Sequence, residues 1–151
     1  MIVFDIQAVQ SIEHGERGIA RYTGELARAL QASHPDLVDV FAYNDALPYV
    51  SRLDTLGLEG KLRSFSELRG QRVDLLHVNS PFEQASIAVL VAPVIAERTV
   101  VTCYDLIPYR FSDIYLPTKG DKAWYQSRLG MLVSSDAIVT DSQSAADDVV
   151  R

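Results

Sequence analysis

The sequence predicts an α/β fold in which a Rossmann-like parallel sheet carries helices on both faces. Short apolar segments alternate along the chain with segments of helical periodicity. Most of the apolar segments lack the polar–apolar alternation of a half-exposed strand, so both of their faces are expected to be buried. In such sheets a ligand lies at the carboxyl ends of the strands, and the loops that follow the strands are therefore the places to search for a site.

The predicted strands and helices follow one another in regular order. Strands are expected at 2–6, 37–43, 61–65, 73–78, 99–103 and 137–140. Helices are expected from 19 until His34-Pro35 ends the first, then at 47–58, 82–90 and 119–133, with a last one that Ser142 or Ser144 caps. Residues 104–108 are expected to form an extended loop after the fifth strand.

Composition limits the class of protein. The chain has 151 residues, enough for one domain, and a net charge of −6, which argues against a nucleic-acid-binding surface. Its single cysteine, Cys103, excludes an internal disulfide and fits a reducing cytosol. The N-terminus runs into a strand rather than a signal peptide, and no apolar stretch could cross a membrane. A cytoplasmic location is expected, with peripheral contact at the inner face of the membrane left open.

The connection from the first strand to the first helix carries two glycines, Gly15 and Gly18. The helix that follows has an apolar stripe made of Ile19, Tyr22, Leu26 and Leu30. A glycine loop can bring its backbone close to a ligand, and the first N–H groups of a helix can bind an anion. The glycines do not match G-x-G-x-x-G or a P-loop, so on local grounds Gly18 is equally well explained as the residue that turns the chain into the helix.

Four segments together resemble one known family. They are the strand ending in Asp5-Ile6-Gln7, the segment from Arg17 to Tyr22, the segment from Val100 to Pro108, and Ala137 to Ser142 followed by Ser144. In this order, over nearly the whole chain, they are similar to the N-terminal domain of a retaining glycosyltransferase of the GT-B fold, family 4.

The resemblance implies a two-domain enzyme. Residues 1–151 would form the Rossmann-like, acceptor-side domain, the N-terminal half of a GT-B fold. The C-terminal domain that binds the nucleotide sugar would be absent, so this chain alone is expected to be inactive. The implied reaction moves a hexose, mannose by family frequency, from a GDP- or UDP-sugar to a saccharide or lipid-linked acceptor in surface polysaccharide synthesis. No cofactor and no metal are expected.

The resemblance and the positions after strand ends give eight candidate site residues. They are Gly18, Ile19 and Arg21 for the donor, Tyr104 and Asp105 for catalysis, and His14, Asn79 and Glu83 for the acceptor. In the donor group, backbone N–H groups and an arginine would meet the diphosphate. The alternatives are a solvated helix face for Arg21, a turn cap for Asp105 and a loop turn for Asn79.

Tyr104 departs from the family pattern. Many members have His-Asp where this chain has Tyr104-Asp105, and that histidine contacts the donor sugar near the reaction centre. A tyrosine hydroxyl can still donate a hydrogen bond, but it differs in shape and does not titrate near neutrality. The nearby His77 and Cys103 are expected to be buried strand residues without a catalytic role.

Two other functions compete with the transferase. A GT-B sugar-nucleotide epimerase would also need a nucleotide domain but no acceptor. A non-catalytic, flavodoxin-like binding module is the alternative outside enzymes. A receiver-type module would need an acidic pair after the first strand, and none follows Asp5.

Overall fold

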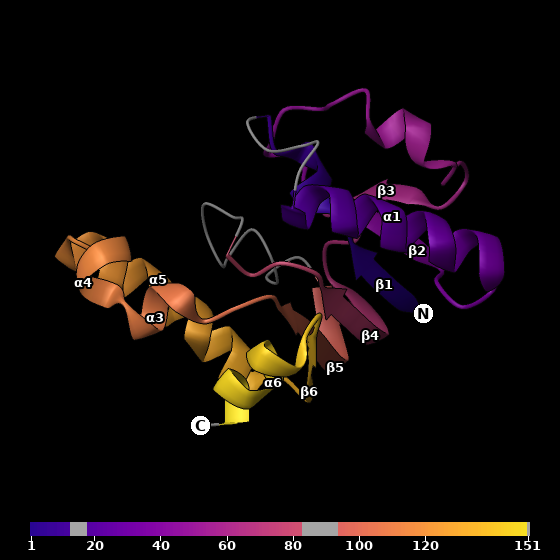
Figure 1. The fold of residues 1–151 in the computed structure, drawn as a ribbon. Coiled ribbons are helices and arrows are strands. Elements are labelled where there is room, and N and C mark those ends of the chain that lie inside the picture. The colour runs from indigo at the N-terminus through magenta and orange to yellow at the C-terminus, as the bar shows by residue number, and fades with distance from the viewer. Residues whose placement is uncertain (13–17, 83–93, 151) are drawn as a thin grey trace.

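A single parallel sheet organises the protein. The computed structural model describes residues 1–12, 18–82 and 94–150. Within them, six strands pair in the order β3-β2-β1-β4-β5-β6, and every neighbouring pair is parallel (Figure 1). The strands are β1 Ile2–Asp5, β2 Val40–Tyr43, β3 Leu62–Ser64, β4 Gln71–Val78, β5 Val94–Cys103 and β6 Ala137–Thr140. The predicted α/β fold with a Rossmann-like sheet is confirmed.

Helices connect the strands. The α-helices in the described ranges are α1 Gly18–Ser33, α3 Ile107–Arg110, α4 Ser112–Tyr115, α5 Lys119–Ser134 and α6 Gln143–Val150. Two 3-10 helices, η1 Gln7–Gln10 and η2 Leu53–Leu56, follow β1 and β2. No described helix is long and apolar enough to span a bilayer.

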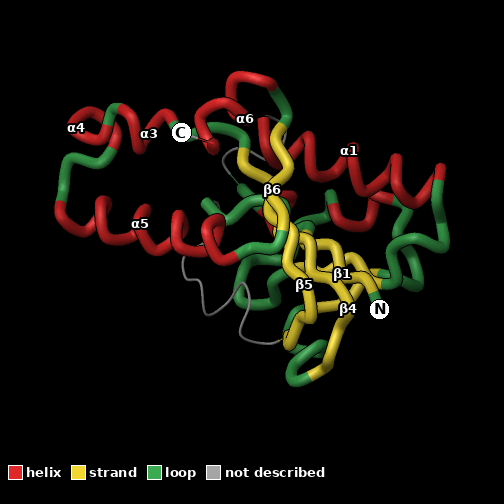
Figure 2. Tube along the Cα trace, turned by 90° about the horizontal axis from the view of Figure 1, so that it is seen from below, coloured by secondary structure: helices red, strands yellow, loops and turns green. Residues whose placement is uncertain are grey.

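Both faces of the sheet are covered, because successive residues of its central strands enter different cores. Val3 of β1 belongs to a core that includes Met131 and Leu132 of α5, whereas Phe4 belongs to a second core that includes Ala27 of α1. Figure 2 shows α1 and α5 on different sides of the sheet. This alternation is what a strand with side-chain period two produces when it is buried on both faces.

The most deeply buried residues of α1 lie beside the apolar stripe that the sequence predicts. They are Ala20, Thr23, Gly24 and Ala27, whereas Tyr22 of the stripe is 37% exposed. Small side chains let the helix approach its neighbours closely: a methyl group added at Gly24 would lie 3.4 Å from the Leu56 side chain. Leu26 and Leu30 of the stripe are partly buried and pack against the same core, so the stripe prediction holds for these two residues.

Several other element predictions need correction. The second strand begins only at Val40, and β5 begins at Val94, before the predicted residue 99. The loop predicted at 104–108 turns at Ile107 into the short helices α3 and α4, with Pro108 in the first turn, where its missing N–H costs nothing. The helix predicted at 82–90 lies outside the described residues, apart from Phe82.

Helix α5 begins at Lys119, as predicted, and a capping box that was not predicted precedes it. Thr118 accepts the N–H of Asp121 at 3.1 Å through its hydroxyl, and the Asp121 carboxylate accepts the N–H of Thr118 at 3.1 Å. This reciprocal capping box satisfies donors that a helix start would otherwise leave free. At α6, Ser142 is the cap, since its hydroxyl accepts the N–H of Ala145 at 3.2 Å.

We expect Thr118→Ala to lower the free energy of unfolding by about 1 kcal/mol, because the N-terminal N–H groups of α5 lose their cap. Thr118→Ser keeps the hydroxyl and is expected to cost much less. Urea denaturation followed by circular dichroism measures both variants. An equal loss in Thr118→Ser and Thr118→Ala would show that the cap contributes little.

Candidate functional site

The strand order places the candidate site. The chain runs from β1 outward to β3 on one side and from β4 outward to β6 on the other, so the order reverses between β1 and β4. In open α/β sheets the crevice at such a reversal, outside the carboxyl ends of the strands, is where ligands bind. Here those ends are Asp5 of β1 and Val78 of β4, with Cys103 of β5 next to them.

An aromatic pocket of about 320 Å³ opens beside this reversal. We call it the aromatic pocket; it is lined by Ile19, Phe82, Tyr104, Asp105, Pro108, Tyr115, Leu116, Trp124 and Tyr125. The first turn of α1, the end of β5 and the α3–α5 segment all contribute to it. Its volume lies in the range of small-molecule sites, and its lining is mostly aromatic and apolar with a few polar groups.

Tyr104 links the pocket to its surroundings. Its ring packs edge-to-face against Tyr22 of α1, with ring centroids 5.4 Å apart. Its hydroxyl lies 3.5 Å from Asn79 Oδ1 at the end of β4, a long hydrogen bond. The neighbouring Asp105 is exposed, and its Oδ1 accepts the N–H of Ile107 at 3.0 Å. Asp105 therefore caps the turn into α3 while one carboxylate oxygen remains available to the pocket.

The far wall of the pocket comes from α5. Tyr125 is buried and stacks on Phe82 at 4.8 Å between centroids, while Trp124 is 36% exposed. The guanidinium of Arg128, itself 1% exposed, lies 5.2 Å from the Trp124 ring centroid, a cation–π contact. Tyr125 belongs to the core and Trp124 does not, yet both line the pocket. Burial raises the pKa of the Tyr125 phenol, so it stays neutral.

Beneath the carboxyl edge runs a chain of buried side-chain hydrogen bonds. Gln7 donates from Nε2 to Asp5 at 3.1 Å and accepts from Asn44 Nδ2 at 3.0 Å. Gln10 in turn accepts the backbone N–H of Asn44 at 2.7 Å and donates to its carbonyl at 2.9 Å. These contacts tie η1 to the end of β2. These hydrogen bonds could not be predicted from the sequence, because Asn44 lies 37 residues from Gln7 and 34 from Gln10 along the chain.

Asp5 is the ionisable member of this buried chain. It is 1% exposed, and burial raises the pKa of its carboxyl to about 7, although N–H donors from Gln7 and Asn79 oppose the rise. Beside it, Asn79 Nδ2 and Ser80 Oγ are buried without a hydrogen-bond partner among the described residues. Buried polar groups are normally paired, so these two are open to a further polar partner at the strand reversal.

The structure gathers some predicted site residues and separates others. Ile19, Tyr104 and Asp105 line the aromatic pocket, and Asn79 reaches it through the Tyr104 hydroxyl. Gly18 begins α1 with a φ of +50°, a left-handed conformation that favours glycine. Arg21 lines a different pocket, on the opposite side of α1. The predicted acceptor residues His14 and Glu83 lie outside the described residues.

Two strand residues were expected to be buried, and the structure buries Cys103 fully and His77 in part. His77 Nε2 lies 2.8 Å from Thr102 Oγ1, and burial lowers the pKa of its imidazole to about 4. Cys103 is fully buried, and burial raises the pKa of its thiol to about 11. Among the described residues, no three His, Cys, Asp or Glu side chains gather as a metal site. That the reaction needs no metal stays a prediction.

The chain is similar to one curated glycosyltransferase along almost its whole length. It is 26% identical over 184 aligned positions to the serotype-specific mannosyltransferase WbdA of Escherichia coli, an alignment that covers 99% of this chain. The same alignment covers 22% of the E. coli protein, so the chain spans about a fifth of its relative. No protein-family model matches the chain. No solved structure matches it either.

We expect the Asp5 carboxyl to make stability depend on pH. Its pKa is higher in the folded chain, about 7, than in the unfolded chain, near 3.8, so its stabilising contribution is full below pH 3.8 and is lost as pH rises to about 7. The free energy of unfolding of the wild type should therefore fall by up to about 4 kcal/mol across this window, and Asp5→Asn should lack this fall.

Urea denaturation of both proteins at several pH values measures this difference. His77 titrates in an overlapping window with the opposite sign, because its folded pKa is lowered, but it is present in both proteins and cancels in the comparison. Parallel curves for the wild type and Asp5→Asn would show that Asp5 is ionised with an ordinary pKa.

Proposed function

We propose that this chain is the acceptor-side part of a retaining glycosyltransferase of the GT-B type, family 4, that transfers mannose from a nucleotide sugar during surface polysaccharide synthesis. The observation that carries the proposal is the similarity of 99% of the chain to part of a mannosyltransferase. The strand order, which is the classic dinucleotide-binding order, and the pocket beside its reversal support it.

The aromatic pocket is suited to an acceptor sugar. Tyrosine and tryptophan offer an apolar ring together with one polar group, which matches a sugar ring with its apolar C–H face and its hydroxyl edge. Tyr104 and Trp124 supply such surfaces, and Asp105 supplies an acceptor for a hydroxyl at the rim. Asn79 contacts the Tyr104 hydroxyl, and its buried Nδ2 would be available to a polar group that reaches past Tyr104.

The start of α1 is suited to the leaving group of the donor. The N–H groups of Gly18 and Ile19 belong to the first turn, where an α-helix leaves its donors unpaired. Such a terminus stabilises negative charge, and the diphosphate gains charge as its bond to the sugar breaks. Because Ile19 also lines the aromatic pocket, the leaving group and the acceptor would lie next to each other.

Asp105 is the residue best placed to take part in the reaction. Its carboxylate stands at the rim between the α1 start and the aromatic wall, where a hydroxyl of the acceptor would enter. A carboxylate in this place orients the attacking hydroxyl and stabilises positive charge as it develops on the sugar ring. Tyr104, next to Asp105 in the lining, is fixed by its ring contact with Tyr22 and its hydrogen bond to Asn79.

The first test is transfer itself. The full-length gene product, with the 151-residue chain in parallel, is supplied with GDP- and UDP-sugars, with and without oligosaccharide or lipid-linked acceptors. We expect release of nucleoside diphosphate from GDP-mannose that requires an acceptor, and none from the 151-residue chain alone. Release without an acceptor would favour an epimerase or hydrolase, and neither binding nor turnover would favour a binding module.

The second test separates the charge of Asp105 from its role as a turn cap. Asp105→Asn keeps an oxygen for the Ile107 N–H but removes the charge, so we expect transfer to fall about 100-fold with an unchanged melting temperature. Asp36→Asn, at an exposed site beyond the end of α1, is the matched control and should retain transfer. Full activity in Asp105→Asn would show that Asp105 only caps the turn into α3 and takes no part in transfer.

A further inference from the structure

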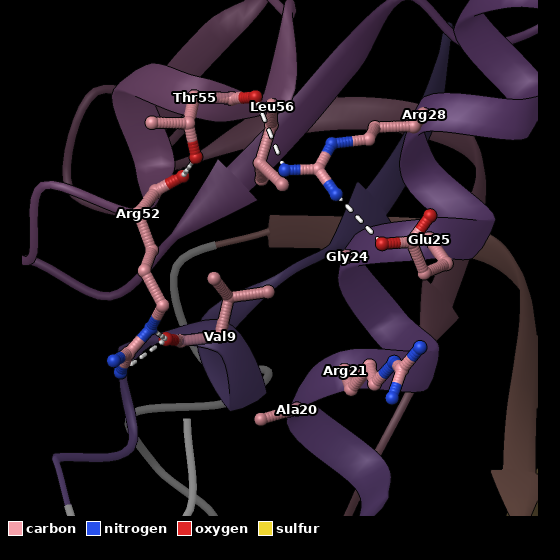
Figure 3. Close-up of a pocket in the computed structure, with 9 residues that line it drawn as sticks. All are labelled: Val9, Ala20, Arg21, Gly24, Glu25, Arg28, Arg52, Thr55 and Leu56. Carbon is pink, nitrogen blue, oxygen red and sulfur yellow. Dashed lines mark hydrogen bonds and ion pairs between the residues drawn. The ribbon is translucent and has the colours of Figure 1, made fainter. Parts of the chain in front are cut away.

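A second pocket lies on the side of α1 that faces away from Tyr104. It has a volume of about 420 Å³ and is formed between α1, η1 and η2. We call it the arginine pocket; its lining is Val9, Ala20, Arg21, Gly24, Glu25, Arg28, Arg52, Thr55 and Leu56 (Figure 3). None of these residues lines the aromatic pocket. The two pockets are therefore separate sites that share one helix.

The arginine pocket has a cationic rim over an apolar floor. Three arginines and one glutamate give its lining a net charge of +2, although the whole chain carries −6. Val9, Ala20 and Leu56 supply the floor. A concentration of arginine against the overall charge of a protein attracts anions, and it does so locally rather than through the field of the whole molecule.

Two of the arginines are already fixed by the fold. Arg52 donates from Nε and Nη2 to the Val9 carbonyl, at 3.3 and 3.2 Å. Arg28 donates to Glu25 at 2.7 Å and to the Thr55 carbonyl at 3.2 Å, and so joins α1 to η2. A guanidinium carries five N–H donors, so each keeps some for a ligand. Side chains held in advance lose less freedom when a ligand binds.

Arg21 completes the rim. It is exposed, and among the described residues it makes no hydrogen bond or ion pair; in Figure 3 no dashed line joins it to its neighbours. It stands on the same side of α1 as Arg28, two turns away, whereas Ile19 and Tyr22 face the aromatic pocket. This placement assigns Arg21 to the arginine pocket instead of the donor contact predicted from the sequence.

We propose that the arginine pocket binds a phosphate ester, independently of sugar transfer at the aromatic pocket. Planar guanidinium groups pair with phosphate oxygens through parallel hydrogen bonds, and a phosphate dianion matches the net charge of the lining. The pocket is larger than a phosphate group alone, and its apolar floor has room for the carbon skeleton of the ester. The phosphate belongs either to a soluble metabolite or to a phospholipid headgroup.

The test uses the 151-residue chain and requires no transferase activity, so its result is independent of the proposed function. Glycerol 3-phosphate and, as the uncharged probe, glycerol are titrated by NMR, with the backbone amides of Ala20, Gly24 and Thr55 as reporters. Vesicles of phosphatidylcholine with and without phosphatidic acid form the second arm. We expect saturable shifts with the phosphate ester, none with glycerol, and no involvement of the Tyr104 amide.

Matched variants locate the binding. Arg21→Gln should weaken it roughly tenfold, since one charged partner is lost at a position that makes no hydrogen bond or ion pair with another described residue. Glu25→Gln should tighten it, because the carboxylate that opposes the anion is removed. Arg72→Gln changes an exposed arginine at the start of β4, outside the pocket, and should leave binding unchanged.

Each outcome decides the proposal. Binding of glycerol 3-phosphate, or of phosphatidic acid vesicles alone, that follows this order of variants supports it and identifies the soluble or the lipid source. Equal weakening by Arg21→Gln and Arg72→Gln would show a general charge effect and overturn it. The absence of saturable binding to both probes would overturn it as well.

Discussion

The burial of strand β1 on both faces is the constraint on which the rest of the structure depends. Its backbone pairs with β2 on one side and β4 on the other, and Val3 and Phe4 enter different cores. A strand enclosed in this way has no lateral access to solvent. Polar groups and ligands can therefore meet the centre of the sheet only beyond the ends of the strands, and both pockets lie next to the loops that leave those ends.

The buried polar side chains at this edge of the sheet lower the stability of the fold, because their burial removes them from water. Asp5 is buried at the end of β1 and would be ionised at neutral pH if it were exposed; burial instead raises its pKa to about 7. The amides of Gln7, Asn44 and Gln10 partly compensate, because they provide hydrogen bonds that water no longer can. Buried ionisable groups with displaced pKa values gather at functional sites, and Asp5 stands where the strand order reverses.

The sheet could be predicted from the sequence because strand burial leaves a local signal: apolar runs between helical segments. The Ser142 cap of α6 could be predicted as well, because a cap is also a local signal. Only some of the residues that line the aromatic pocket could be predicted from the sequence. Tyr104 and Asp105 follow a strand directly and could be predicted, whereas Tyr115 and Trp124 reach the pocket only through the turns of α3 and α4. The most deeply buried residues of α1 were not predicted, because close packing buries its small residues more completely than the hydrophobic stripe beside them.

Helix α1 separates the two pockets, because each lies against one of its sides. Its small buried residues fix its distance from the sheet, and Gly18 fixes the direction in which it starts. Ile19 then lines the aromatic pocket, and Tyr22 packs against Tyr104. Arg21 and Arg28 line the arginine pocket, where Arg28 donates to the Thr55 carbonyl of η2. The contact of Arg28 with η2 and the contact of Tyr22 with Tyr104 therefore lie on different sides of one rigid helix. This separation is the physical reason why a ligand in the arginine pocket is expected to leave the aromatic pocket unchanged.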